Sequence, residues 1–214
     1  MADGHLFPDE PDDTRITILK ATYAALAEHG YADLTVKRIG HYFPKSEGVI
    51  FYHYDDIDDI LLDLLDYLLD RFVYIEMPVP DDEDPKTRLR SLFEQVVSET
   101  DEQEIRDYEK ALMELRMRAA QDKEFQECFN QSQDVFRQTI QEIIRDGIES
   151  GDFRDVDPEP VADFLVKLVS GEIFERVTAG VSRPIKSELD NYIEYRLLAD
   201  KEHRYSRDEP NDVS

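Results

Sequence analysis

The side chains best placed for chemistry in this sequence are phosphate-binding groups gathered between residues 35 and 54. Thr35 stands where a short helix is expected to begin, and its hydroxyl can cap that helix or donate to a phosphate oxygen. Lys37 follows one turn in, facing outward. Ser46 precedes a second short helix, whose first backbone N–H groups favour an anion. This spacing predicts a surface that binds phosphate groups.

The second short helix carries side chains that can read the edges of bases. Glu47 can accept a hydrogen bond from a cytosine amino group, and Val49 can touch a thymine methyl group. Gly48 lets the backbone approach closely. Tyr52 and His53, near the end of the helix, are expected to anchor to a sugar–phosphate backbone. A lone histidine is also a common structural residue, so this alternative stays open for His53.

The sequence does not contain the residue patterns of known catalytic or metal-binding sites. The run His53-Tyr54-Asp55-Asp56 lacks the further ligands of a helical metal-dependent hydrolase, and no two histidines stand four residues apart. There is no Gly-rich phosphate loop and no Gly-x-Ser-x-Gly segment. Cys128 lies among apolar neighbours without a nearby histidine, which favours a core thiol over a nucleophile. The sequence therefore predicts no enzyme, no catalytic residue, no metal site and no cofactor.

Helical periodicity runs through the whole chain. Its clearest instance covers residues 57–73, where Ile and Leu recur at helical spacing and Asp fills the opposite face. No segment alternates with period two for long enough to predict a strand. The fold class is therefore expected to be all-α, with about nine helices. They are expected over residues 16–30, 35–40, 46–52, 57–73, 86–99, 103–120, 123–149, 159–179 and 189–197.

The chain is strongly acidic, but unevenly so. Its 214 residues hold 50 Asp and Glu against 25 Lys and Arg, a formal net charge of −25. Residues 14–54 hold five bases and three acids, a net charge of +2, whereas residues 55–84 hold twelve acids and one base. A locally basic segment is what a docked phosphate backbone requires. An ordinary surface of this length can also reach +2 by chance, so charge alone does not decide.

The remaining acids are spread over the whole chain, with Asp in excess of Glu and Arg in excess of Lys. This predicts adaptation to concentrated intracellular salt, where charges are screened within about 3 Å at 1 M. An ordinary acidic protein from a dilute cytoplasm is the alternative. The apolar runs are too short to cross a membrane, residues 1–5 begin no secretory signal, and Cys128 is the single cysteine. We therefore expect a cytoplasmic protein with no membrane partner.

Two segments together resemble the DNA-binding signature of the TetR family of transcriptional regulators: Thr35–Gly40 (TVKRIG) and Ser46–Tyr54 (SEGVIFYHY). Residues 18–31 are similar to the family's first helix and its Gly-aromatic exit, and residues 147–158 to the connection between its last two main helices. The resemblance covers about residues 14–180. It implies a helix-turn-helix whose second short helix enters the major groove of double-stranded DNA.

The chain departs from the family pattern at several positions. Phe43-Pro44 occupies the turn, and Lys45 replaces an apolar residue and is expected to add a phosphate contact. Phe51 stands where the family usually has Tyr, and Ile57 where a Lys usually contacts phosphate. We therefore expect fewer phosphate contacts than is typical of the family. The predicted DNA-binding residues are Thr35, Lys37, Lys45, Ser46, Glu47, Gly48, Val49, Tyr52 and His53.

The resemblance also implies a division of labour along the chain. The expected parts are a mobile acidic arm (1–13), a three-helix helix-turn-helix domain (14–54), a connecting helix (55–77), a C-terminal regulatory and dimerisation domain (80–200) and a polar tail (201–214). The helices at 123–149 and 159–179 are the candidates for the homodimer interface, because the second is too apolar to be solvated on its own. A helix buried within one subunit is the alternative.

A small apolar or amphipathic effector is a further expected partner. Phe and Met side chains at helical spacing can line a cavity for it, although such a stripe can equally be plain core. The candidate lining residues are Phe72, Phe93, Met113, Met117, Phe125, Phe129 and Phe136.

Two hypotheses result. The favoured one is a TetR-like homodimeric repressor that binds a near-palindromic operator and is released by an effector. The other is a helical interaction protein that has kept the fold and lost DNA binding, suggested by Phe51, Ile57 and the acidic start of the helix that follows.

Overall fold

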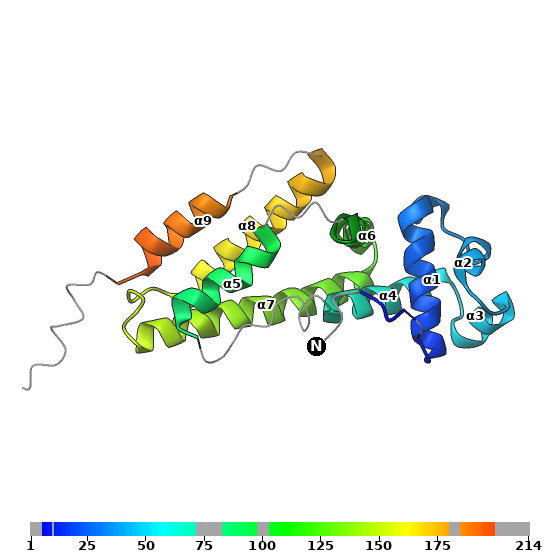
Figure 1. Ribbon diagram of the computed structural model, residues 1–214, viewed down its shortest axis with the longest axis horizontal. Helices are drawn as coiled ribbons and strands as arrows, with labels where there is room; N and C mark the ends of the chain where they lie inside the picture. Colours follow the sequence, from blue (N-terminus) through cyan, green and yellow to red (C-terminus); the bar gives the residue numbers. More distant parts are fainter. Residues whose placement is uncertain (1–5, 10, 72–82, 98–102, 180–184, 200–214) are drawn as a thin grey trace, which may run out of the picture. The chain divides into compact units, whose positions relative to one another are not determined.

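The computed structural model describes residues 6–9, 11–71, 83–97, 103–179 and 185–199, with the side chains of 94–97 left undescribed. The predicted all-α fold is confirmed (Figure 1). The helices are α1 Thr14–His29, α2 Val36–Tyr42, α3 Glu47–His53, α4 Ile57–Arg71, α5 Pro85–Val97, α6 Gln103–Ala119, α7 Lys123–Glu149, α8 Pro158–Ala179 and α9 Lys186–Tyr192. A 3₁₀ turn, η1 Tyr31–Asp33, follows α1, and a π-helical turn, η3 Ile193–Leu197, follows α9.

The chain forms two compact units. The first comprises Met1–Glu76 and Thr100–Asp134, and the second comprises Met77–Glu99 and Val135–Ser214. Helix α7 contributes its first part to one unit and its second part to the other. The helix-turn-helix therefore shares a core with α6 and the start of α7, although these helices follow the linker at which the sequence suggested a boundary.

The core of the first unit is formed mainly by α1, α4 and α6. Helix α4 buries the apolar stripe that its sequence pattern predicted, from Ile60 to Leu69, while its aspartates face away from that stripe. Tyr108 of α6 donates its hydroxyl to the Leu68 carbonyl at 3.0 Å, which satisfies a buried polar group at this packing. The connecting helix is thereby fixed against α6 by both apolar burial and a hydrogen bond.

Part of the N-terminal arm is packed against this core, which differs from the mobile arm expected from sequence. Phe7 is buried, and its ring stacks on Tyr67 of α4 with centroids 4.9 Å apart. The Tyr67 hydroxyl donates to the Leu6 carbonyl at 3.0 Å, and the Lys20 ammonium donates to the carbonyls of residues 8–9 at 2.8 and 2.9 Å. One aromatic ring and two hydrogen-bonding side chains thus order a segment that is otherwise acidic and rich in proline.

In the second unit, α5 packs against α8 and also against α9 (Figure 1). Four charged side chains join α5 to α9 and η3: Arg90 pairs with Asp190 of α9 at 3.0 Å and with Glu194 of η3 at 3.2 Å, and Lys86 reaches Glu194 at 2.9 Å. Beneath them, Leu189 and other apolar residues of the last helical segment are buried, as the sequence pattern predicted.

A short antiparallel pairing closes one end of the second unit. Phe153 and Leu198 form a β-bridge, and the Arg154 N–H donates to the Leu197 carbonyl at 2.7 Å. The Phe153 ring lies directly over Gly147 of α7, where a Cβ atom would meet it at 2.3 Å. Only glycine fits at this position, because any side chain would displace the buried ring.

Candidate nucleic-acid interface

The turn between α2 and α3 is held by apolar wedges on both sides. Ile39 of α2 and Ile50 of α3 are both buried, and they join the two short helices through apolar contact. Phe43, within the turn, is buried as well. The unusual Phe43-Pro44 turn therefore adds an aromatic side chain to the core, and it leaves the helix-turn-helix geometry intact.

Both short helices begin at the predicted caps. The Thr35 hydroxyl oxygen accepts a hydrogen bond from the Arg38 N–H at 3.2 Å, so its predicted capping role is confirmed. Ser46 is the N-cap residue of α3 and its hydroxyl makes no capping hydrogen bond. That hydroxyl stays available as a donor beside the first N–H groups of α3, which is the arrangement expected for a phosphate contact.

The outer surface of α3 is aromatic as well as polar. Tyr52 is 85% exposed and Phe51 is 59% exposed, and such high exposure is unusual for large aromatic side chains of a folded protein. Gly48 and His53 are also exposed, whereas Val49 is half-buried. From the sequence, Phe51 is notable only because it lacks the hydroxyl of the tyrosine that the family usually has there. Its exposure shows that the ring also faces outward.

Glu47 lies against α2. A Cβ atom on Gly40 would meet the Glu47 Cγ at 2.7 Å and its Oε1 at 3.0 Å, so the missing side chain of Gly40 makes room for this glutamate. The Glu47 carboxylate thus packs over the neighbouring helix in the free protein. Its predicted hydrogen bond to a cytosine amino group stays a prediction.

Much of the basic charge in residues 14–54 is already engaged. Arg15 is paired with Asp63, and Arg38 lies 3.5 Å from an Asp33 carboxylate oxygen. Lys37 is exposed and makes no ion pair or hydrogen bond within the described chain. The Lys45 ammonium donates only to the Thr14 hydroxyl, at 2.9 Å. The Lys20 ammonium is held by the carbonyls of residues 8–9, so Lys37 and Lys45 are the lysines of this segment that remain available to neutralise phosphates.

The end of α3 is tied to the long helices by a carboxylate. Asp63 of α4 accepts two hydrogen bonds from Arg15 of α1, at 2.9 Å from Nε and 2.5 Å from Nη2. It also accepts a hydrogen bond from the hydroxyl of Tyr54, the residue that caps the C-terminus of α3. The hydrogen bonds that Arg15 donates to Asp63 raise the pKa of the Arg15 guanidinium. Burial, followed by the hydrogen bond to Asp63, raises the pKa of the Tyr54 hydroxyl. The network links three helices through one polar group.

The aspartates at the start of α4 have structural partners. The Asp59 N–H donates to Asp56 at 3.0 Å, and the Asp55 N–H donates to Asp59 at 3.2 Å, so these carboxylates cap the helix reciprocally. Asp58 pairs with Arg118 at 2.8 Å. Ile57, which replaces the usual phosphate-binding lysine, is half-buried against the core. The acidic start of this helix is therefore explained by capping and pairing.

The helix-turn-helix also contacts α6 through the exit of α1. Gly30 adopts a φ of +72°, which glycine accommodates without strain, and turns the chain away from α1. The next N–H, of Tyr31, donates to the Glu114 carboxylate of α6 at 2.6 Å. Nothing in the sequence pointed to this contact, because its two residues are far apart in the chain.

The predicted effector-lining residues are divided between the two units. Phe125 and Phe129 are buried in the first unit, where Met113 is half-buried and Met117 is exposed. Phe93 and Phe136 are buried in the second unit, with ring centroids 6.2 Å apart. Phe72 lies outside the described residues. A cavity lined by these side chains stays a prediction.

Other chemistries find little support in the described part of the chain. Burial raises the pKa of the Cys128 thiol to about 11, which disfavours the nucleophilic thiolate. Among the described residues, no three His, Cys, Asp or Glu side chains are grouped so as to hold a metal ion. Within the same residues, no helix is long and apolar enough to cross a membrane.

Comparisons with known proteins agree with this geometry. Residues 85–184 match the family described as the BetI-type transcriptional repressor, C-terminal. The chain is 25% identical over 187 residues to the HTH-type transcriptional repressor AcnR of Corynebacterium glutamicum, covering 87% of this chain and 93% of that protein.

Solved structures extend the likeness. A TetR transcription regulator from Haloarcula marismortui is 34% identical, with a TM-score of 0.78 and coverage of 86% of this chain and 98% of that one. A putative transcriptional regulator from Saccharomonospora viridis, solved in complex with choline, shares the fold with a TM-score of 0.73 at 24% identity, covering 89% and 100% of the two chains.

Proposed function

Because this chain belongs to the TetR family of transcription regulators, we propose that it is a homodimeric repressor that binds a near-palindromic operator through α2 and α3. That the chain is a DNA-binding transcription regulator follows from its relatives and its fold. The proposal adds the contacting residues, the dimer, the direction of regulation and the release by an effector.

The observation that carries the proposed DNA contacts is the outer surface of α2 and α3. It combines an unpaired lysine, Lys37, with a second lysine, Lys45, and with the highly exposed ring of Tyr52. Lysines neutralise phosphates, and an exposed aromatic hydroxyl donates to them. Thr35, Ser46, Glu47, Gly48, Val49 and His53 complete the proposed contact set. Of these, Ser46 keeps a free hydroxyl beside the first turn of α3.

The proposed dimer interface centres on one face of α8. The exposed residues on that face recur at alternating spacings of three and four, which is the repeat that favours packing against a second helix. They are Phe164, Lys167, Gly171, Phe174 and Thr178. No atom lies within 4 Å of a Cβ built on Gly171, so a partner helix can approach closely there. Val135 of α7 is also exposed, in keeping with a contribution from that helix.

Dimerisation sets the geometry of DNA recognition. Two copies related by a two-fold axis would present two α3 helices to half-sites about one helical turn, or ~34 Å, apart. This supports an operator with two related halves. We further propose that a small apolar or amphipathic effector releases the repressor, and that the protein acts in the cytoplasm, where its DNA is.

The acidic composition fits the same function if the protein works in concentrated salt. Phosphate contacts lose affinity as salt rises, with a log–log slope of about −0.9 for each neutralised charge. A regulator with only two available lysines per subunit depends little on such contacts. Base contacts and DNA shape then supply more of the affinity.

Footprinting on the DNA upstream of the protein's own gene tests the proposal. Wild type is expected to protect a segment with two related halves, and Tyr52→Ala is expected to lose that protection. Lys110→Ala is a matched surface control, because Lys110 is exposed on α6 and away from the proposed contacts. The same titration run with and without candidate effectors reports on release.

Absence of protection at every salt concentration at which the protein stays folded would favour the alternative of a helical interaction protein. In that case, the double variant Lys37→Ala with Lys45→Ala would behave like wild type in every assay. Ile57 is the feature that supports this alternative, because it packs against the core and no lysine is present at its position to bind phosphate.

A further inference from the structure

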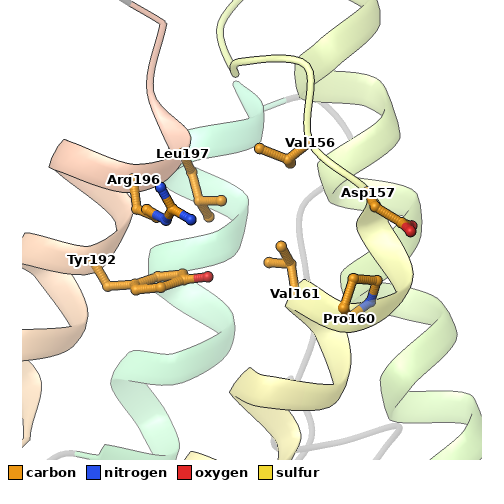
Figure 2. A pocket seen from close by; sticks show the side chains of 7 residues that line it. All are labelled: Val156, Asp157, Pro160, Val161, Tyr192, Arg196 and Leu197. Atoms are coloured by element: carbon orange, nitrogen blue, oxygen red, sulfur yellow. The ribbon is translucent and has the colours of Figure 1, made fainter.

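A hollow of about 370 Å³ lies in the second unit between the start of α8 and the end of the last helical segment. This volume falls within the range of about 300–1,000 Å³ that is usual for small-molecule sites. Its lining comes from three places in the sequence, namely the loop before α8, the first turns of α8, and residues 192–197. Figure 2 shows the lining side chains: Val156, Asp157, Pro160, Val161, Tyr192, Arg196 and Leu197.

Arg196, an exposed side chain, is the positively charged group that lines this hollow. Its guanidinium makes no hydrogen bond, ion pair or ring contact within the described residues, whereas Arg90, Arg137 and Arg154 of the same unit each make at least one. Two of the three acids on the same helical segment, Asp190 and Glu194, are engaged elsewhere, because they pair with Lys86 and Arg90 of α5. An unpaired arginine is unexpected in a chain with twice as many acids as bases.

The wall facing Arg196 is apolar. Figure 2 shows Tyr192 lying beneath the guanidinium, with its hydroxyl directed across the hollow towards Val161. The Tyr192 ring is held from behind by Phe164, at a centroid distance of 5.0 Å. Leu197 is buried and Val156 is half-buried, so the hollow joins one cation and one hydroxyl to a short aliphatic surface. A ligand that matches it has a single anionic end and a small apolar body.

Asp157 limits the ligand to one negative charge. Its carboxylate accepts a hydrogen bond from the Glu159 N–H at 3.1 Å and caps α8, and in Figure 2 it points away from Arg196. This fixed anion at the rim repels a second negative group on the ligand. A monocarboxylate therefore fits better than a dicarboxylate or a phosphate dianion.

We propose that this hollow is a binding site for a small aliphatic monocarboxylate, held by Arg196 and Tyr192 against Val156, Val161 and Leu197. The guanidinium fork matches both oxygens of a carboxylate, and the tyrosine hydroxyl supplies a third donor. The site bridges two helical segments that are far apart in sequence, so an occupied site stabilises the second unit. This inference does not rest on DNA binding, because the site is complete without DNA.

The test uses the full chain with methyl-labelled Val and Leu, titrated with 3-methylbutanoate and followed by NMR at constant chloride. Saturable shifts are expected at the methyl groups of Val156, Val161 and Leu197, with a Kd on the order of 1 mM for so small a ligand. Arg196→Gln is expected to weaken binding by about tenfold or more, and Arg196→Lys by less, since it keeps the charge and loses the fork. Arg145→Gln is the matched control, because Arg145 is exposed on α7 and bonded only to Gln141 of the same helix.

Two further ligands keep the test independent of any variant's folding. The neutral 3-methylbutanamide and the cation choline are expected to cause no saturable shifts at these three methyl groups. The proposal is overturned if 3-methylbutanoate does not saturate, if the amide or choline binds as well, if the shifts occur elsewhere, or if Arg196→Gln binds like wild type. The unfolding temperature gives a parallel readout, because a ligand of the native state raises it in wild type and leaves Arg196→Gln unchanged.

Discussion

Tyr54 donates its hydroxyl hydrogen to Asp63, so the residue that ends the recognition helix α3 is bonded to the middle of the connecting helix α4. Asp63 in turn accepts two hydrogen bonds from Arg15 of α1. One carboxylate thereby links α3 to both α1 and α4.

The raised pKa of the Tyr54 hydroxyl predicts a loss of stability at alkaline pH. Burial and the bond to Asp63 raise its pKa above the ordinary value of 10.0 in the folded protein. Below pH 10 the folded and unfolded forms are both protonated, and the contribution to stability is complete. As the pH rises past 10, the unfolded chain loses the proton first, so the free energy of unfolding falls. Tyr54→Phe should show a shallower fall in urea unfolding measured from pH 8 to pH 11.

Tyr52→Phe is the control for this experiment, since the Tyr52 side chain is exposed and makes no hydrogen bond in the described residues. It should reproduce the wild-type pH profile. Tyr23 retains some alkaline sensitivity in both variants, because burial raises its pKa as well. Identical profiles for Tyr54→Phe and wild type would show that the hydroxyl contributes nothing to the folded state.

Lys37→Ala should weaken DNA binding and flatten its dependence on salt. Each removed phosphate contact lowers the magnitude of the log–log slope by about 0.9, so a dimer that loses two should change by about 2. Wild type should itself show a modest slope, near −4 for four lysine contacts in the dimer. Fluorescence anisotropy at a series of KCl concentrations measures both values. Lys110→Ala should keep the wild-type slope, and a wild-type slope as steep as −10 would contradict the count.

Gly40→Ala should destabilise the helix-turn-helix by about 1 kcal/mol. The new Cβ meets Glu47 Cγ at 2.7 Å, and this overpacking outweighs the better helix propensity of alanine. Combining it with Glu47→Ala removes the obstacle, so in that background Gly40→Ala should stabilise by about 0.5–1 kcal/mol. Thermal unfolding of the four proteins in the cycle gives the coupling energy. An additive cycle would mean that Glu47 does not occupy this space.

Phe7→Ala should lower the free energy of unfolding by about 2–3 kcal/mol. The variant leaves a cavity beside Tyr67 and loses a stacked aromatic pair. Denaturant unfolding provides the measurement, and Phe51→Ala, at an exposed phenylalanine, provides the control. If the arm is mobile, as its composition suggests, both variants will lower the free energy of unfolding by similarly small amounts.

Phe174→Glu should convert the proposed dimer into a monomer. Replacing this ring with a carboxylate removes apolar contact area and places a charge at the centre of the proposed interface, which opposes the packing of two α8 helices. Phe174 is 51% exposed, so a single subunit tolerates the change. Analytical ultracentrifugation reports the mass. Phe51→Glu should stay dimeric because α3 lies outside the proposed interface. A wild-type protein that is monomeric at all accessible concentrations would refute the dimer.

Much of the local structure follows from the sequence because its causes are local. The apolar spacing between Ile57 and Arg71 defines the buried face of α4, and Thr35 begins α2 with its own hydroxyl. Ile39 and Ile50 are buried where the motif required wedges. Helical periodicity and capping act over a few residues, so they can be read without knowing what surrounds them. The locally basic segment and its likeness to a DNA-binding motif are visible for the same reason.

The tertiary structure alone decided which charges and rings are engaged. Arg15 counts as a base in the sequence, yet Asp63, 48 residues away, neutralises it, while Lys37 has no partner among the described residues. Phe7 stands in an acidic, proline-rich segment, and only the nearby position of Tyr67 buries it. The unpaired state of Arg196 likewise depends on α5 binding the neighbouring acids. Each of these outcomes is set by residues brought together by packing, over separations at which sequence periodicity carries no information.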